Sequence, residues 1–270
     1  MPALFLRTAW RGLKDRRQWH NWLQRIGVYR GTQPTRRHIW VHAVSVGESA
    51  AAMPLIRGLL AQFPDNDVVV TTTTLTGADT VRRHLGDSVR HVYFPYDLPW
   101  IVNRFICHHR VDMLIILETE LWPNTIACCA AANIPLVIAS ARLSATSARA
   151  YQRLEPMARA MVSTINVIAV QTEADAERFI RLGAPSNQVT ITGNLKFDIE
   201  LPASLHAQAE AVRRELGVST PLLVLGSTRY GEAPILLTSL PVIPDTHSPL
   251  MMDVQPRVLQ LFLGVRTSFG

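Results

Sequence analysis

The sequence lacks several features that would assign a protein class at once. Three cysteines among 270 residues are too few for a disulfide framework. No apolar run approaches the ~20 residues that a membrane-spanning helix needs. Walker A, GxGxxG and HExxH motifs are absent, and GESA lacks the second glycine of a GxSxG nucleophile elbow. Cys128 and Cys129 are neighbours on an expected helix without zinc-site spacing, so we expect buried thiols and no metal.

The composition is that of an ordinary globular protein, with 48% hydrophobic and 18% charged residues, but its positive charge is uneven. Residues 1–37 hold nine of the 27 Lys and Arg but only Asp15 of the 21 acidic residues. Trp, Leu and Ile recur between these cations at roughly helical intervals. This arm suits a basic amphipathic helix on an anionic membrane, or equally a helix packed on the protein's own body. Because the folded body is not basic, we expect no nucleic-acid partner.

From residue 38 onward, short apolar runs alternate with helical patterns. Such alternation predicts a parallel sheet covered on both faces, which is a doubly wound α/β domain over residues 38–200. Its expected strands are 39–46, 67–73, 90–95, 112–118, 135–140, 165–171 and 188–194. Its expected helices are 49–63, 76–85, 99–110, 121–133, 144–162 and 173–183.

Residues 201–270 predict the start of a second α/β domain. A helix is expected at 207–216 and a strand at 221–228. About one further helix should follow, and then a proline-punctuated tail with few ordered contacts.

Ligands of doubly wound domains bind beyond the carboxyl ends of the strands, so polar residues there are the candidates. The first apolar run leads into Ser45, Gly47 and Glu48. We expect Gly47 to let the backbone turn sharply and approach a ligand. Glu48 has two interpretations: it caps the following helix, or it takes a proton from a substrate hydroxyl.

Later strand ends add further candidates. Glu118 and Glu120 follow a buried strand, where an unpaired charge needs a partner or a role, although Glu120 could also cap the next helix. Arg142 is expected to pair with either glutamate or to clamp an anion, with a surface salt bridge as the alternative. Other polar residues lie at the interdomain break (Asn194 and Lys196) and at a later strand end that suits phosphate or carboxylate (Ser227, Thr228 and Arg229).

Eight motifs in sequence order resemble those of the 3-deoxy-D-manno-octulosonic acid (Kdo) transferases, over residues 1–232. They are WVHAVSVGE, TTTTLTGADTV, YFPYDLP, ILETELWPN, SARLS, VQTEADAERF, TGNLKFD and GSTRYGE. The resemblance implies a two-domain GT-B glycosyltransferase of lipopolysaccharide core biosynthesis. Such an enzyme moves Kdo from CMP-Kdo to the lipid A precursor (lipid IVA), with inversion and without cofactor or metal.

The resemblance also implies roles for parts of this sequence. Glu48 takes the place of the general base, and the second functional glutamate corresponds to Glu118 or Glu120, with a slight preference for Glu120. Residues 38–200 would bind the lipid acceptor and residues 201–270 the donor. The arm would lie at the anionic cytoplasmic side of the inner membrane, so that the protein is peripheral or N-terminally anchored.

After GSTRYGE the sequence departs from the family pattern. The family continues with Pro-Arg-His-Pro-Glu-Arg, glycine-rich and Asn-x-x-Glu motifs, of which this sequence retains Pro256-Arg257. We therefore expect a truncated donor domain. Two main functions stay open: a Kdo transferase, or a catalytically inactive remnant that binds acceptor lipid or membrane. A third option is another GT-B sugar nucleotide enzyme with a different acceptor.

Overall fold

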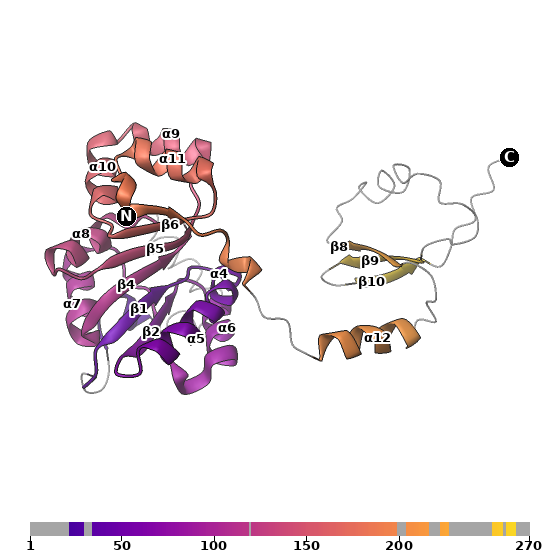
Figure 1. Cartoon of the computed structure of the whole chain (residues 1–270). Coiled ribbons are helices and arrows are strands. Elements are labelled where there is room, and N and C mark those ends of the chain that lie inside the picture. Colours follow the sequence, from indigo (N-terminus) through magenta and orange to yellow (C-terminus); the bar gives the residue numbers. More distant parts are fainter. Residues whose placement is uncertain are drawn as a thin grey trace. The chain divides into compact units, whose positions relative to one another are not determined.

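The computed structural model describes residues 22–29, 34–118, 120–198, 204–215, 222–226, 250–255 and 258–262. The chain divides into two compact units, residues 1–200 and 201–270 (Figure 1). Most of the basic arm, together with Ser227, Thr228 and Arg229, lies outside the described residues.

The first unit contains a seven-stranded sheet in the order β3-β2-β1-β4-β5-β6-β7, in which every neighbouring pair is parallel. The strands are β1 His38–His42, β2 Asp67–Thr72, β3 Arg90–Tyr93, β4 Val111–Leu117, β5 Leu136–Ala141, β6 Val167–Val170 and β7 Val189–Ile191. This order confirms the predicted doubly wound fold, because the chain winds outward in one direction from β1 and in the other from β4.

Helices connect these strands along the chain. The α-helices described in the first unit are α3 Trp22–Arg25, α4 Val46–Ala51, α5 Met53–Gln62, α6 Leu75–Leu85, α7 Pro99–His109, α8 Pro123–Ala131, α9 Ala145–Gln152, α10 Glu155–Ser163 and α11 Glu173–Leu182. Short 3-10 turns are η1 Gly86–Ser88, η2 Ser186–Gln188 and η3 Leu195–Phe197.

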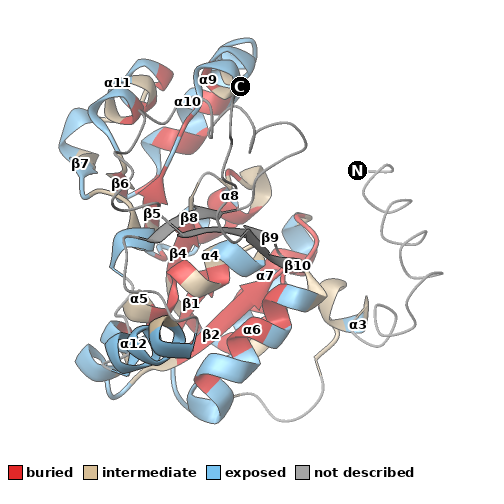
Figure 2. Cartoon of the chain, turned by 90° about the vertical axis from the view of Figure 1, so that its right-hand side faces the viewer, coloured by how far each residue is buried: buried red, intermediate tan, exposed pale blue. Residues whose placement is uncertain are grey.

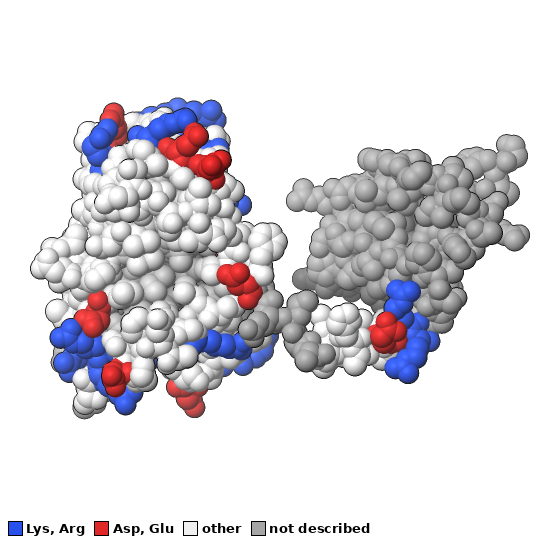
Figure 3. All heavy atoms as spheres, in the orientation of Figure 1, with Lys and Arg blue, Asp and Glu red and all other residues white. Residues whose placement is uncertain are grey.

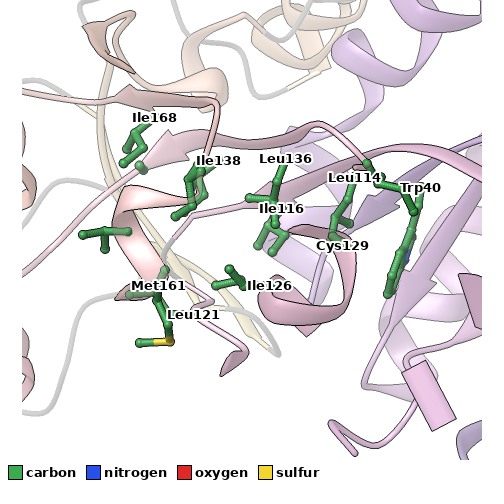
Figure 4. Close-up of a cluster of buried hydrophobic side chains, with 14 of the residues drawn as sticks. Trp40, Leu114, Ile116, Leu121, Ile126, Cys129, Leu136, Ile138, Met161 and Ile168 are labelled. Carbon is green, nitrogen blue, oxygen red and sulfur yellow. The ribbon is translucent and has the colours of Figure 1, made fainter. Parts of the chain in front are cut away.

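Alternate residues of the central strands enter two separate cores. Trp40 of β1 packs 4.3 Å from Phe105 of α7, measured between ring centres, within a cluster that also takes residues of α8, α10 and α11 (Figure 4). Val41, the next residue, joins the cluster of Ile56 from α5 and Val81 from α6. Figure 2 shows the buried central strands between helices with exposed outer surfaces. Burial on both faces explains why these strands are almost continuously apolar.

The first predicted strand is too long, and this changes the start of the site. β1 ends at His42, and Ser45 to Glu48 already form the N-cap and first turn of α4. The predicted helix 49–63 is two helices that meet at Ala52, with Pro54 in the first turn of α5. The predicted helix 144–162 is likewise α9 and α10, and Pro156 opens the second. Proline is tolerated in a first turn because the N–H it lacks has no helical partner there.

The described end of the arm packs on the protein's own body. Gln24 Oε1 accepts a hydrogen bond from the backbone N–H of Tyr93 at 3.2 Å. Arg25 donates to the carbonyl of Thr73 at 2.8 Å, and its guanidinium lies 4.8 Å from the centre of the Tyr93 ring. These contacts place α3 at the carboxyl ends of β2 and β3. The membrane role of the arm stays a prediction.

The second unit contains α12 Leu205–Glu215 and a three-stranded sheet in the order β10-β9-β8. Its strands are β8 Leu222–Gly226, β9 Leu250–Gln255 and β10 Val258–Phe262. β8 and β9 are parallel, whereas β9 and β10 are antiparallel. The sequence predicted α12 and β8 but missed β9 and β10, because the prolines around residues 241–256 favoured an irregular tail.

Among the helices that the structure describes, none is both long and apolar enough to cross a bilayer. On the face of the first unit that Figure 3 shows, charged side chains gather toward the two ends and are sparse between them. Cys128 and Cys129 are buried free thiols, as predicted.

Candidate active site

The predicted glutamates come together where the strand order reverses. β1 and β4 are neighbours in the sheet, although β2 and β3 lie between them in the sequence. α4, which carries Glu48, follows β1, and Glu118 and Glu120 follow β4. The charges of Glu48 and Glu118 both act on Glu120. Carboxylates from two distant segments therefore meet at the crevice where doubly wound folds bind ligands.

Glu48 is held in place by two hydrogen bonds. Its Oε2 accepts from the backbone N–H of Val44 at 2.8 Å, and its Oε1 accepts from the Ser45 hydroxyl at 2.8 Å. Ser45 in turn caps α4 by accepting from the backbone N–H of Glu48 at 3.3 Å. This reciprocal arrangement is close to a capping box. Glu48 is thus built into a helix cap, and each of its oxygens keeps a further lone pair for a substrate proton.

Gly47 does not make the sharp turn predicted for it. It lies in the first turn of α4, and its φ is not among the positive values of the described glycines. A Cβ placed on it would have the Ser45 Oγ, 4.0 Å away, as its nearest neighbour. An exposed glycine here leaves open space beside the Glu48 cap, which suits the approach of a ligand.

Glu118 forms an ion pair with Lys196. The Lys196 Nζ lies 2.8 Å from the Glu118 Oε1, and the two side chains are 48% and 30% exposed. Glu118 has a φ of 57°, the left-handed region that non-glycine residues rarely adopt. Arg142 follows β5 with an exposed side chain, and its pairing with a glutamate stays a prediction.

The third glutamate of this cluster, Glu120, is partly buried and has a raised pKa. Burial, and then the negative charges of Glu48 and Glu118, raise its pKa from 4.5 to about 7. Burial first, and the charge of Glu120 second, raise the pKa of the Tyr151 phenol on α9. A carboxyl group with a pKa near neutral can hold or release a proton under physiological conditions.

The alternative that Glu120 caps α8 is wrong. Trp122 occupies the N-cap position without a side-chain cap bond. The carboxylate of Asp97 accepts instead from the backbone N–H of Asn124 at 3.1 Å and of Thr125 at 2.7 Å. The sequence separates Asp97 from α8 by a whole strand and helix, so no local pattern could have identified this cap.

Asn194 has a structural role in the loop after β7. Its Oδ1 accepts from the backbone N–H of Lys196 at 2.9 Å, and its Nδ2 donates to Gln171 at 3.3 Å. Gln171 also donates to Ser140. Gln171 and Ser140 were not among the residues predicted for the site, although their positions directly after β6 and near the end of β5 were a signal in the sequence.

In the described parts of the chain, His, Cys, Asp and Glu form no group of three or more that could hold a metal ion. His42 also ends a strand at this edge, but it is fully buried and stacks 3.9 Å from Phe94. Burial lowers its pKa to about 3, so it is neutral and packs as part of the core.

Residues 20–199 match the family described as 3-Deoxy-D-manno-octulosonic-acid transferase (kdotransferase). The chain belongs to this family. The Kdo transferase of Haemophilus influenzae is 38% identical over 235 residues, which are 87% of this chain and 55% of that protein. The Kdo transferase of Bordetella pertussis is 34% identical over 247 residues, with coverages of 86% and 55%. The chain thus spans about half the length of these Kdo transferases.

Solved structures agree with the GT-B fold predicted from the family. Anabaena HepE in complex with UDP matches with a TM-score of 0.50 and 14% identity, covering 73% of this chain and 54% of that one. The UDP-GlcNAc 2-epimerase of Methanocaldococcus jannaschii matches with a TM-score of 0.50 and 11% identity, covering 82% and 66%. At such identities the likeness concerns the fold alone.

Proposed function

We propose that the chain acts as a Kdo transferase. It would move Kdo from CMP-Kdo to lipid IVA, with inversion and without a metal, in lipopolysaccharide core biosynthesis. It would do so at the cytoplasmic side of the inner membrane, held peripherally or by its N-terminal arm. The observation that carries this proposal is the convergence of Glu48 and Glu120, from opposite sides of the switch point, in a chain of the Kdo transferase family.

Glu48 would act as the general base. A sugar hydroxyl is a poor nucleophile at neutral pH, so a carboxylate must accept its proton as the hydroxyl oxygen bonds to the anomeric carbon. The bond from that carbon to the CMP phosphate breaks in the same displacement, and CMP leaves with the electron pair. The Val44 N–H and the Ser45 hydroxyl orient Glu48 for this step.

Glu120 would supply a second position for the proton. Its raised pKa comes from burial and from the neighbouring carboxylates, and two glutamates in different environments can divide acid and base roles. The predicted substrate contacts of Arg142, Lys196, Ser227, Thr228 and Arg229 would serve the anionic donor and acceptor groups.

Release of CMP from CMP-Kdo, with and without lipid IVA in detergent micelles, tests this function directly. We expect release that depends on the acceptor. Binding of lipid IVA without CMP release would instead support the alternative, a catalytically inactive chain that holds acceptor lipid or membrane. If the chain binds neither lipid IVA nor anionic lipid vesicles and releases no CMP, both assignments are wrong.

A further inference from the structure

Ser140 and Gln171 tie the segment after β7 to the carboxyl edge of the sheet. The Nε2 of Gln171 donates to the carbonyl and to the hydroxyl of Ser140, at 2.9 and 3.2 Å. Asn194 Nδ2 donates to Gln171 Oε1 at 3.3 Å, and the backbone N–H of Leu195 donates to Ser140 Oγ at 3.3 Å. The ends of β5 and β6 thereby hold the start of η3.

Ser140 adopts a backbone conformation that serves this contact. It is buried, and its φ of 55° lies in the left-handed region. The register of β5 against β6 shifts between Ile138 and Ala141, which marks a bulge or a similar irregularity at this point. Bulges redirect side chains, and strained backbone persists where surrounding contacts hold it. Here the Oγ receives donors from both Gln171 and Leu195.

The hydrogen-bonded chain ends in the ion pair of the candidate site. Asn194 accepts from the Lys196 backbone N–H at 2.9 Å, so the same asparagine joins Gln171 and Lys196. Lys196 then reaches Glu118 at 2.8 Å. Glu48 from α4, Glu118 after β4 and Tyr151 from α9 surround Glu120 electrostatically. Lys196 from η3 brings a positive charge to Glu118, one member of this group.

We propose that Ser140 and Gln171 are positioning residues that hold Lys196 on Glu118, and that this ion pair sets the negative charge around Glu120. The inference deepens the proposed function, because Glu120 belongs to the proposed active site. Its test does not require that transfer occurs.

The test is an NMR titration of the Glu120 carboxyl in the full chain, labelled with ¹³C-glutamate and assigned by loss of the signal in Glu120→Gln. Lys196→Met leaves the charge of Glu118 uncompensated, so the Glu120 midpoint should rise by about half to one pH unit. Lys196→Arg keeps the charge and should titrate close to wild type. Lys196 is exposed, so neither variant threatens the fold.

Gln171→Leu tests the positioning role. It removes the amide contacts at nearly constant side-chain size, so the Glu120 midpoint should rise, but by less than in Lys196→Met. In the double variant the rise should equal that of Lys196→Met alone, because both changes act through one ion pair. Arg37→Met is the matched control. It breaks an exposed ion pair at the amino edge of the sheet, in which Arg37 Nη1 lies 2.6 Å from Asp112 Oδ1. The Glu120 midpoint should be unchanged in this variant.

An unchanged midpoint in Lys196→Met would show that the ion pair does not set the charge around Glu120. A shift in Lys196→Met with none in Gln171→Leu, or an additive double variant, would show that Gln171 does not position Lys196. Absence of CMP release with all expected shifts present would count against the proposed function alone.

Discussion

At the amino edge of the seven-stranded sheet two aspartates pair with arginines, whereas at the carboxyl edge three glutamates share one cluster and Glu118 pairs with Lys196. Arg36 and Arg37 precede β1 and pair with Asp67 at 3.6 Å and Asp112 at 2.6 Å, in the neighbouring strands β2 and β4. Three glutamates follow the other ends of β1 and β4, and the negative charges of Glu48 and Glu118 help to raise the pKa of Glu120. The two aspartates of the amino edge each have an arginine partner, whereas the carboxyl edge, the edge at which doubly wound folds bind ligands, gathers three glutamates around one lysine pair.

The largest expected effect of breaking this asymmetry is on transfer. Glu48→Gln removes the proposed base, so acceptor-dependent CMP release should fall by about 100-fold or more. The amide can still accept from the Val44 N–H and donate to the Ser45 oxygen, so stability should change by no more than ~1 kcal/mol.

Asp112→Asn is the matched control for Glu48→Gln, because it changes a carboxylate at the amino edge. It should leave CMP release close to wild type. Equal losses in the two variants would mean that the edges do not differ in function.

A second prediction concerns Asp97, a buried carboxylate that accepts several hydrogen bonds, in contrast to Glu120, whose pKa is raised. Asp97 is buried and accepts from the backbone and side chain of Thr125 as well as from Asn124. Asp97→Ala leaves these donors without their charged acceptor and should lower the free energy of unfolding by about 2–4 kcal/mol. Urea unfolding followed by tryptophan fluorescence measures this, since all six tryptophans lie in the first unit. A loss below ~1 kcal/mol would show that Asp97 is dispensable for the α8 cap.

Glu120 should make the first unit less stable as pH rises. Its pKa is about 7 in the folded chain against an ordinary 4.5, so the native state binds more protons between these values. The free energy of unfolding should therefore decrease from pH 4.5 to about 7. At pH 8 the free energy of unfolding of Glu120→Gln should exceed that of wild type by on the order of 1–2 kcal/mol, after allowance for solvent screening. At pH 4, where Glu120 is protonated in both states, this difference should vanish. A pH-independent difference would contradict the raised pKa.

The smallest effect is expected at the amino edge. Arg37→Met breaks an exposed pair with Asp112 and should cost about 0.5 kcal/mol or less, decreasing further in high salt. Urea unfolding at low and high salt measures it. A loss above ~1.5 kcal/mol would show that the fold depends on this neutralised edge.

Much of the fold followed from local patterns. The β-branched run at 67–73 predicted β2, and the apolar run at 112–118 predicted β4. Boundaries failed where turn chemistry decided them: Ser45 caps α4 and so shortens β1, and Pro156 splits the predicted long helix. β9 and β10 were missed because the prolines around residues 241–256 favoured an irregular tail, and because the pairing of β9 with β8 joins residues far apart in the sequence.

The candidate site was predictable in its members but not in its arrangement. Strand-end position and family resemblance both indicated Glu48, Glu118 and Glu120. Neither showed that Lys196 is an ion-pair partner of Glu118, or that Asp97 caps α8. Each of these contacts joins residues far apart in the sequence, and short-range periodicity carries no information about such pairs.

The sequence by itself determined the alternation of strands and helices, the parallel sheet and the identity of the glutamates, because these depend on local composition and order. Only the tertiary structure decided that Glu48 takes part in the cap of α4 and that its negative charge also acts on Glu120. The cap and the proposed base are therefore compatible roles of one residue. The physical reason is the reversal of winding between β1 and β4, which makes the ends of two strands that are distant in the sequence neighbours in the sheet.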